Sequence, residues 1–128
     1  MVIGIVLVSH SAALAQGLAE MLAAIGSAGV PVAVAGGAAH GGLGTSVEFI
    51  QAAIDAADQG DGVVIIPDLG SSVLSARTVL ESVDGRRVVL VDAPFVEGAV
   101  AAAVTAASGA SLEDVAEAAR QARDVPKF

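Results

Sequence analysis

The sequence has no cysteine, no tryptophan and no tyrosine, and its 128 residues include 3 phenylalanines. Without cysteine there can be no disulfide framework, no thiolate nucleophile and no cysteine-based metal or iron–sulfur site. The apolar 55% of the chain therefore consists mainly of alanine and aliphatic side chains. Side chains of this size favour close packing of helices on a sheet.

Positive charge and long apolar runs are also scarce. Lys and Arg total 6 against 14 Asp and Glu, a formal net charge of -8. An acidic surface repels nucleic acid phosphates and anionic lipids but attracts a basic protein. The apolar runs IVLV and VVII are far shorter than the roughly 18 residues of a membrane span, and the amino-terminal stretch has no basic leader. We therefore expect a cytoplasmic protein that binds proteins or small molecules, with no nucleic acid and no membrane.

Four apolar runs predict the strands of a sheet. They occupy residues 2–10, 30–37, 61–68 and 86–92. Because the runs are apolar without alternation, they are typical of strands buried on both faces of a parallel sheet. The sequence predicts an α/β fold, a doubly wound and mainly parallel central sheet of four or five strands flanked by helices. We expect residues 1–128 to form a single domain.

The alanine-rich stretches between and after these runs predict helices. They span residues 12–26, 45–57, 71–83, 95–108 and 111–123. In the first of them, large apolar side chains recur at helical spacing and predict one stripe that packs on the sheet. These side chains are Leu14, Leu18, Met21, Leu22 and Ile25. Thr45 with Glu48, and Ser111 with Asp114, have the spacing of capping pairs and predict where two helices begin.

Polar residues follow every predicted strand and should gather at one edge of the sheet. They are SHS (9–11), GGAAHGGLGTS (36–46), PDLGSS (67–72) and DAPFVEG (92–98). Open α/β sheets bind ligands outside the carboxyl ends of their strands, where free N–H groups at helix starts favour anions. We therefore look for the functional site in these four loops.

His10 and Asp68 are the first candidates for chemistry in these loops. A neutral imidazole can accept a phosphoryl group near pH 7, although a histidine at a strand end more often caps the next helix. Asp68 ends the third predicted strand, which in a doubly wound sheet often neighbours the first. A carboxylate that accepts one ring N–H leaves the other ring nitrogen free to attack. Alternatively Asp68 caps the following helix, a role that Ser71 or Ser72 could also fill.

The loop after the second strand has more glycine than a simple connection needs. Its glycines are Gly36, Gly37, Gly41, Gly42 and Gly44. They allow the backbone to approach a phosphoryl group closely, and Thr45 and Ser46 offer hydroxyl and N–H groups at a helix start. The loop matches neither GxxxxGK[ST] nor GxGxxG, so a flexible connection without function stays open. We expect His40 within it to be exposed and incidental.

Three other site types fit the sequence poorly. Two distant histidines give no metal-ligand cluster, and we expect neither a metal nor another cofactor. Ser9 and Ser11 lack the GxSxG turn of a hydrolase nucleophile. A receiver-like domain phosphorylated on Asp68 would need acidic residues after the first strand to hold magnesium, where this sequence has SHS.

The motifs taken together resemble a known family. GIVLVSHSAALAQGL, AGG followed by GGLGTS, VVIIPDLGSS, VDAPFVEGAV and GASLEDVAEAA are similar to the IIA domains of the mannose-type phosphotransferase system (PTS). The resemblance covers Val2 to about Arg123. The segment APFVEGA is more specifically similar to the branch of that family that serves PTS-dependent dihydroxyacetone kinases.

The resemblance implies a phosphocarrier with His10 phosphorylated and Asp68 orienting it. The phosphoryl group would come from phospho-HPr, itself charged through Enzyme I, and would pass to ADP held by the subunit DhaL. The ATP formed there would phosphorylate dihydroxyacetone bound to DhaK. Five residues are expected to line the phosphoryl site, namely Ser11, Gly37, Thr45, Ser46 and Ser72. Ser11 is also expected to start the helix after His10.

The family also implies a homodimer. A IIA subunit that feeds a sugar transporter remains an alternative, as does a regulatory module whose phosphorylation state is read by a transcription factor. A nonenzymatic α/β binding domain is the remaining alternative.

Overall fold

The computed structural model describes residues 1–83 and 85–128. Within them, four parallel strands form one sheet in the order β2-β1-β3-β4. The strands are β1 (Gly4–Ser9), β2 (Val32–Gly36), β3 (Val63–Pro67) and β4 (Val88–Leu90). The predicted α/β fold with a parallel central sheet is confirmed, and its four strands lie within the four predicted runs.

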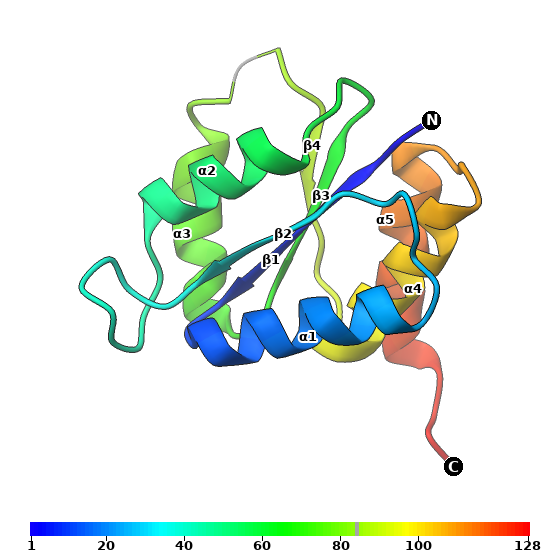
Figure 1. The fold of residues 1–128 in the computed structure, drawn as a ribbon, viewed down its shortest axis with the longest axis horizontal. Helices are drawn as coiled ribbons and strands as arrows, with labels where there is room; N and C mark the ends of the chain where they lie inside the picture. Colours follow the sequence, from blue (N-terminus) through cyan, green and yellow to red (C-terminus); the bar gives the residue numbers. More distant parts are fainter. Residues whose placement is uncertain (84) are drawn as a thin grey trace.

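Helices cover both faces of this sheet (Figure 1). The helices are α1 (Ala12–Ala24), α2 (Val47–Ala57), α3 (Gly70–Leu80), α4 (Phe95–Ala107) and α5 (Leu112–Gln121), with a short 3-10 turn at Ala122–Asp124. Helices α1, α4 and α5 lie on one face, and α2 and α3 lie on the other. The result is a three-layer sandwich in which the sheet is the middle layer.

The continuous apolar runs are explained by this middle position. Along β1, Ile5 and Leu7 pack toward α1 and α4, whereas Val6 and Val8 pack toward α2 and α3. Successive side chains of a strand point to opposite faces, so a strand covered on both sides needs apolar residues at every position. All six residues of β1 are buried.

The apolar stripe predicted on the first helix is only partly right. Leu18 and Leu22 are buried, but Leu14, Met21 and Ile25 are 46%, 39% and 45% exposed. Ala15, which is completely buried, packs against the sheet together with Leu18 and Leu22. Because alanine lets α1 come close to the sheet, the buried stripe is narrow and the three larger side chains lie on its flank.

The predicted helix starts differ from the structure in one place. Ser46, not Thr45, caps α2: its Oγ accepts the Phe49 N–H at 3.2 Å. Ser111 caps α5 as predicted, with its Oγ accepting the Asp114 N–H at 3.2 Å. Both serines have extended backbone angles, which the residue before the first helical turn requires.

The strand order sets the position of the site. The chain leaves β1 toward β2 on one side, and β3 lies on the other side of β1. The strand order therefore reverses between β1 and β3, and doubly wound sheets bind ligands at the carboxyl ends of the strands beside such a point. No helix within the described ranges is both long and apolar enough to cross a membrane.

Candidate functional site

His10 and Asp68 follow the two central strands directly. Strands β1 and β3 are paired in parallel, with Val8 opposite Pro67. The Asp68 N–H extends the ladder by donating to the Val8 carbonyl at 2.9 Å. This register puts the Asp68 side chain beside His10 although the two residues are 58 positions apart.

Both oxygens of the Asp68 carboxylate accept hydrogen bonds. Oδ2 accepts from Ser9 Oγ at 2.9 Å and from the His10 N–H at 3.0 Å. Oδ1 accepts from Ser72 Oγ at 2.6 Å and from the Leu69 N–H at 2.7 Å. It also lies 3.0 Å from His10 Nδ1. The carboxylate is held from several directions, and its side chain is 8% exposed.

These contacts keep Asp68 ionised. Partial burial acts to raise the pKa of Asp68, but hydrogen bonds from Ser72, His10 and Ser9 outweigh it and lower the pKa to about 2. Hydrogen bonds to the charged form of a carboxyl group stabilise that form. Asp68 is therefore an anion at neutral pH, and it can only accept hydrogen bonds.

An ionised Asp68 determines which nitrogen of His10 carries the proton. Because Oδ1 can only accept, the hydrogen of a neutral His10 ring resides on Nδ1. The lone pair of Nε2 is then directed away from Asp68. The His10 side chain is 23% exposed. The arrangement provides an oriented nitrogen nucleophile at the surface.

The two serines at the start of α3 lie on opposite sides of the imidazole ring. Ser72 is completely buried, and its Oγ contacts Asp68 and lies 3.1 Å from His10 Nδ1. Ser71 is exposed, and its Oγ lies 2.5 Å from His10 Nε2. Ser72 therefore supports the orienting carboxylate, whereas Ser71 faces the free nitrogen.

Neither serine caps α3, and Asp68 does not cap it either. The residue before α3 is Leu69, which provides no side-chain cap. Sequence reasoning treated Ser71 as a possible cap and missed its contact with the ring. A signal existed, because the Ser71–Ser72 pair occupies the first turn of a helix that begins beside Asp68, and adjacent helical residues point in different directions.

The glycine-rich loop packs against the backbone of SHS. The Gly37 N–H donates to the Ser9 carbonyl at 3.0 Å, and the Gly44 N–H donates to the His10 carbonyl at 3.0 Å. Gly37 has a φ of 79°, and a Cβ there would lie 3.2 Å from the Gly42 oxygen. A larger residue at position 37 would be strained, so glycine is needed for this close approach.

The other expected lining residues act on the surrounding backbone. Ser11 caps α1 by accepting the Leu14 N–H at 3.2 Å, and Ser46 caps α2. Thr45 Oγ1 lies 2.5 Å from Ser75 Oγ and so links the glycine loop to α3. In the described part of the chain, Gly37, Thr45, Ser11 and Ser46 form no hydrogen bond with the His10 ring. His40 is exposed and accepts the Gly42 N–H at 3.2 Å.

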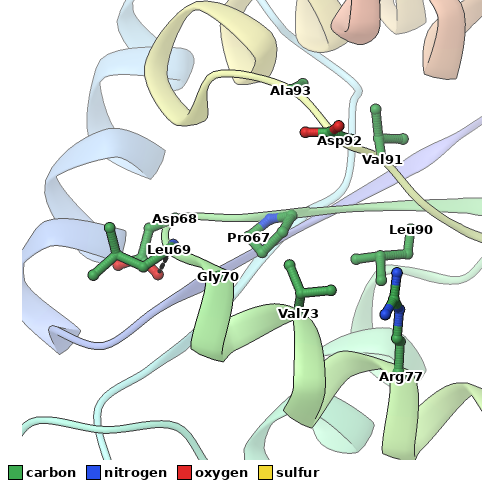
Figure 2. Close-up of a pocket in the computed structure, with 10 residues that line it drawn as sticks. All are labelled: Pro67, Asp68, Leu69, Gly70, Val73, Arg77, Leu90, Val91, Asp92 and Ala93. Atoms are coloured by element: carbon green, nitrogen blue, oxygen red, sulfur yellow. Dashed lines mark hydrogen bonds between the residues drawn. The ribbon is translucent and has the colours of Figure 1, made fainter.

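A cavity of about 400 Å³ adjoins the site between β3 and β4. Figure 2 shows Asp68 and Leu69 at one end of it and Arg77 at the other, with Leu90 and Val73 near Arg77. His10 does not line this cavity. Among the described residues, no group of three or more His, Asp or Glu side chains is arranged to hold a metal ion.

The family follows from comparison with known proteins. A protein-family model described as the PTS system fructose IIA component, EIIA-man, matches residues 4–116. The chain belongs to this family. Membership confirms the resemblance seen in the sequence, and the matched region includes both His10 and Asp68.

Curated relatives of the chain are named as DhaM subunits. The chain is 38% identical over 116 residues to "PEP-dependent dihydroxyacetone kinase 2, phosphoryl donor subunit DhaM" of Listeria innocua, covering 88% of this chain and 93% of that one. It is 36% identical over 119 residues to the phosphoryl donor subunit DhaM of Escherichia coli, covering 88% of this chain. The match spans 25% of the Escherichia coli subunit, and similar fractions of other long relatives.

Solved structures support the same fold. A crystal structure described as an unknown function protein EF1359 superposes with a TM-score of 0.86 at 34% identity, covering 94% of this chain and 95% of that one. A sigma-54 interaction domain protein from Enterococcus faecalis superposes with a TM-score of 0.56 at 15% identity. The second match shows a shared fold alone.

Proposed function

We propose that this EIIA-man chain is the phosphoryl-donor subunit of a PEP-dependent dihydroxyacetone kinase. In this proposal His10 accepts a phosphoryl group from phospho-HPr and passes it to ADP bound on DhaL. The ATP formed there phosphorylates dihydroxyacetone on DhaK. The names of the curated relatives support the kinase role. The observation that carries the chemistry is the His10 ring, with Nδ1 on Asp68 and Nε2 directed outward.

Nε2 is the nitrogen that we assign to the phosphoryl group. Its lone pair attacks phosphorus while the bond between phosphorus and the donor's nitrogen breaks. The hydrogen on Nδ1 stays there, so the phosphorylated ring carries a positive charge beside the Asp68 carboxylate 3.0 Å away. That charge pair favours the phosphorylated ring, and onward transfer to ADP reverses the same bond changes.

The start of α3 is suited to hold the transferring oxygens. Because Leu69 provides no side-chain cap, the N–H groups of the first turn are free of a capping side chain. Such groups, together with the helix dipole, favour a phosphoryl group. The Ser71 hydroxyl must first turn away from Nε2, which costs one hydrogen bond of about 1 kcal/mol.

The surface around His10 suits a protein partner. The segments 9–17, 36–47 and 69–76 contain no Lys, Arg, Asp or Glu, although the chain has a net charge of -8. Leu43, Leu69 and Leu74 in these segments are 79%, 62% and 66% exposed. An uncharged apolar surround allows close docking without repelling an incoming phosphoryl group, while the acidic remainder attracts a basic donor such as HPr.

We also expect a homodimer, as the family resemblance implies. An apolar groove of about 500 Å³ between α4, α5 and the residues after them offers a face for a second copy. Val96 and Val125, which line this groove, are 42% and 70% exposed. Light scattering on the wild type and on Val96→Glu checks this: the variant should lose the dimer, and an unchanged mass would rule out this face.

Phosphorylation of the purified chain tests the central proposal. Incubation with phosphoenolpyruvate, Enzyme I and HPr should add one acid-labile phosphoryl group, detected by intact mass. His10→Ala should not gain it, because the nucleophile is gone, whereas His40→Ala should gain it normally. His40 is a matched control because it is an exposed histidine whose ring accepts the Gly42 N–H. Phosphorylation of His10→Ala would refute the assignment.

A sugar-transporter IIA subunit is the second candidate. It is favoured by the description of the matching family model as a PTS fructose component. The phosphorylated chain should be mixed in parallel with DhaL and ADP, and with the IIB domain of a mannose-type transporter. Transfer to ADP alone supports the kinase subunit, and transfer to the IIB domain alone supports the transporter role.

A further inference from the structure

Ser71, His10 and Asp68 stand in the order of a hydrolase triad. Ser71 Oγ lies 2.5 Å from His10 Nε2, and His10 Nδ1 lies 3.0 Å from Asp68 Oδ1. The three side chains come from the start of α3 and from the ends of β1 and β3. A nucleophile, a base and an orienting carboxylate are recognised by such distances and roles, and the same geometry occurs on unrelated folds.

The tautomer of the ring makes Ser71 the donor in its contact. Since Asp68 keeps the hydrogen on Nδ1, Nε2 can only accept, and the Ser71 hydroxyl must donate to it. A histidine that accepts a hydrogen bond from a serine is placed to remove the hydroxyl proton. Ser71 is exposed, so a substrate can reach its oxygen.

Backbone donors lie beside this serine. Ser71 is the second residue of α3, and the Ser72 N–H donates to the Leu69 carbonyl at 3.0 Å. Among the described residues, the N–H groups of Gly70 and Ser71 have no acceptor. Donors of this kind stabilise an oxyanion that forms on a carbonyl attacked by the neighbouring hydroxyl.

The side chains around Ser71 select the type of acyl group. Leu69 and Leu74 lie two positions before and three positions after it and are 62% and 66% exposed. Segment 69–76 carries no charged residue. An apolar acyl group would therefore contact leucine side chains. Because this surface is open, it favours a short acyl group over a long one.

We propose that Ser71, His10 and Asp68 form a triad that hydrolyses activated esters of small apolar acids. Ser71 Oγ forms a bond to the carbonyl carbon while its proton moves to His10 Nε2. The bond to the leaving alcohol then breaks, and that alcohol takes the proton from Nε2. Water attacks the acyl-serine in the same way, releases the acid and restores Ser71. This activity goes beyond phosphoryl transfer and needs no other protein.

The absence of a GxSxG turn does not oppose this activity. Ser9 and Ser11, the serines next to His10 in the sequence, have other roles: Ser9 binds Asp68 and Ser11 caps α1. The serine that reaches Nε2 comes from a different strand end, and a first helical turn exposes its hydroxyl and its backbone donors together. Phosphoryl transfer and ester hydrolysis would compete for the same Nε2.

Hydrolysis of p-nitrophenyl acetate and p-nitrophenyl butyrate by the full chain alone tests the proposal. The wild type should release p-nitrophenol with an initial burst, and peptide mapping should find the acyl group on Ser71. Ser71→Ala should lower the rate at least about tenfold. Ser82→Ala is the matched control, because Ser82 follows α3 and its Oγ bonds to the Val79 carbonyl. It should keep the wild-type rate.

Direct acylation of His10 is the competing mechanism. It predicts that Ser71→Ala keeps or exceeds the wild-type rate and that the acyl group maps to the ring; this result would overturn the triad. Phenylmethylsulfonyl fluoride gives a second readout, since it should modify Ser71 in the wild type and fail to modify it in His10→Ala. Labelling of other serines instead would also overturn it. Because neither Enzyme I nor HPr is present, these outcomes are independent of the phosphotransfer test.

Discussion

Helix α3 begins differently from α1, α2 and α5. Those three helices are each capped by a serine, namely Ser11, Ser46 and Ser111. Helix α3 has serines in its first turn as well, but they contact His10 and Asp68 and leave the preceding position to Leu69. In α1, α2 and α5 the serine stabilises the helix start, whereas the first-turn serines of α3 contact the imidazole ring and its carboxylate. Local rules are most often broken where function requires it.

The largest expected effect comes from breaking the contact between Asp68 Oδ1 and His10 Nδ1, beside the start of α3. Asp68→Asn keeps the side-chain shape but removes the anion that holds the hydrogen on His10 Nδ1. We expect phosphoryl transfer from phospho-HPr to slow by about a hundredfold or more, measured by quench-flow or rapid mass analysis. The capped regions should be unaffected, so Ser111→Ala serves as the control. A wild-type rate in Asp68→Asn would remove the orienting role.

Because of the same carboxylate, the free energy of unfolding should depend on pH. The pKa of Asp68 in the folded protein is about 2, below the ordinary value of about 3.9. A lowered folded pKa stabilises the protein above the unfolded value, and this contribution is lost as the pH falls from about 4 to about 2.

Urea unfolding of the wild type and Asp68→Asn at pH 7 and at pH 2 measures this contribution. We expect the stability advantage of the wild type to be about 2 kcal/mol larger at pH 7 than at pH 2. An equal advantage at both pH values would show that the hydrogen bonds around Asp68 do not favour its charged form.

Removal of serine should affect the two kinds of helix start differently. Ser46→Ala leaves the Phe49 N–H without its acceptor and should lower the free energy of unfolding by about 1 kcal/mol. Ser71→Ala removes no cap and should lower it by less than about 0.5 kcal/mol. Urea unfolding of both variants at pH 7 checks this difference, and similar losses would show that Ser71 is structural after all.

The smallest expected change restores a cap to α3. Leu69 has an extended backbone and is 62% exposed, so a serine would fit there with little loss of buried surface. Leu69→Ser should raise the free energy of unfolding by about 0.5 kcal/mol and, by occupying the first-turn N–H groups, slow phosphoryl transfer. Thermal unfolding and transfer kinetics measure both. A stabilised variant with unchanged transfer would show that these groups do not hold the phosphoryl oxygens.

Much of the fold could be predicted because burial on both faces leaves a clear pattern. Continuous apolar runs such as the one that forms β1 occur where every position packs against a helix. The helix boundaries could be predicted less well, since Thr45 and Ser46 are both suitable caps and the structure places Ser46 next to the first turn. The predicted apolar stripe on α1 was too wide, because the helix packs on the sheet through the small side chain of Ala15 and leaves the larger Leu14, Met21 and Ile25 partly exposed.

The candidate site was predicted less completely. Proximity of His10 and Asp68 followed from the usual neighbourhood of strands in a doubly wound sheet, and the pairing of β1 with β3 provides it. The sequence indicates that Ser71 and Ser72 point in different directions, but it could not predict which of them contacts Nε2 of His10. Their positions depend on the rotation of α3 about its axis, which is set by packing of buried Ala76 and Val79 against the sheet.

The sequence by itself determined the strands, the helices and the set of polar residues that follow the strands, because hydrophobic periodicity and turn residues are local properties. Only the tertiary structure decided which nitrogen of His10 faces outward and which serine reaches it. Those facts depend on distances between residues about 60 positions apart, and on five hydrogen bonds that meet at one carboxylate. Contacts of that range arise from the packing of three layers, and no local pattern records them.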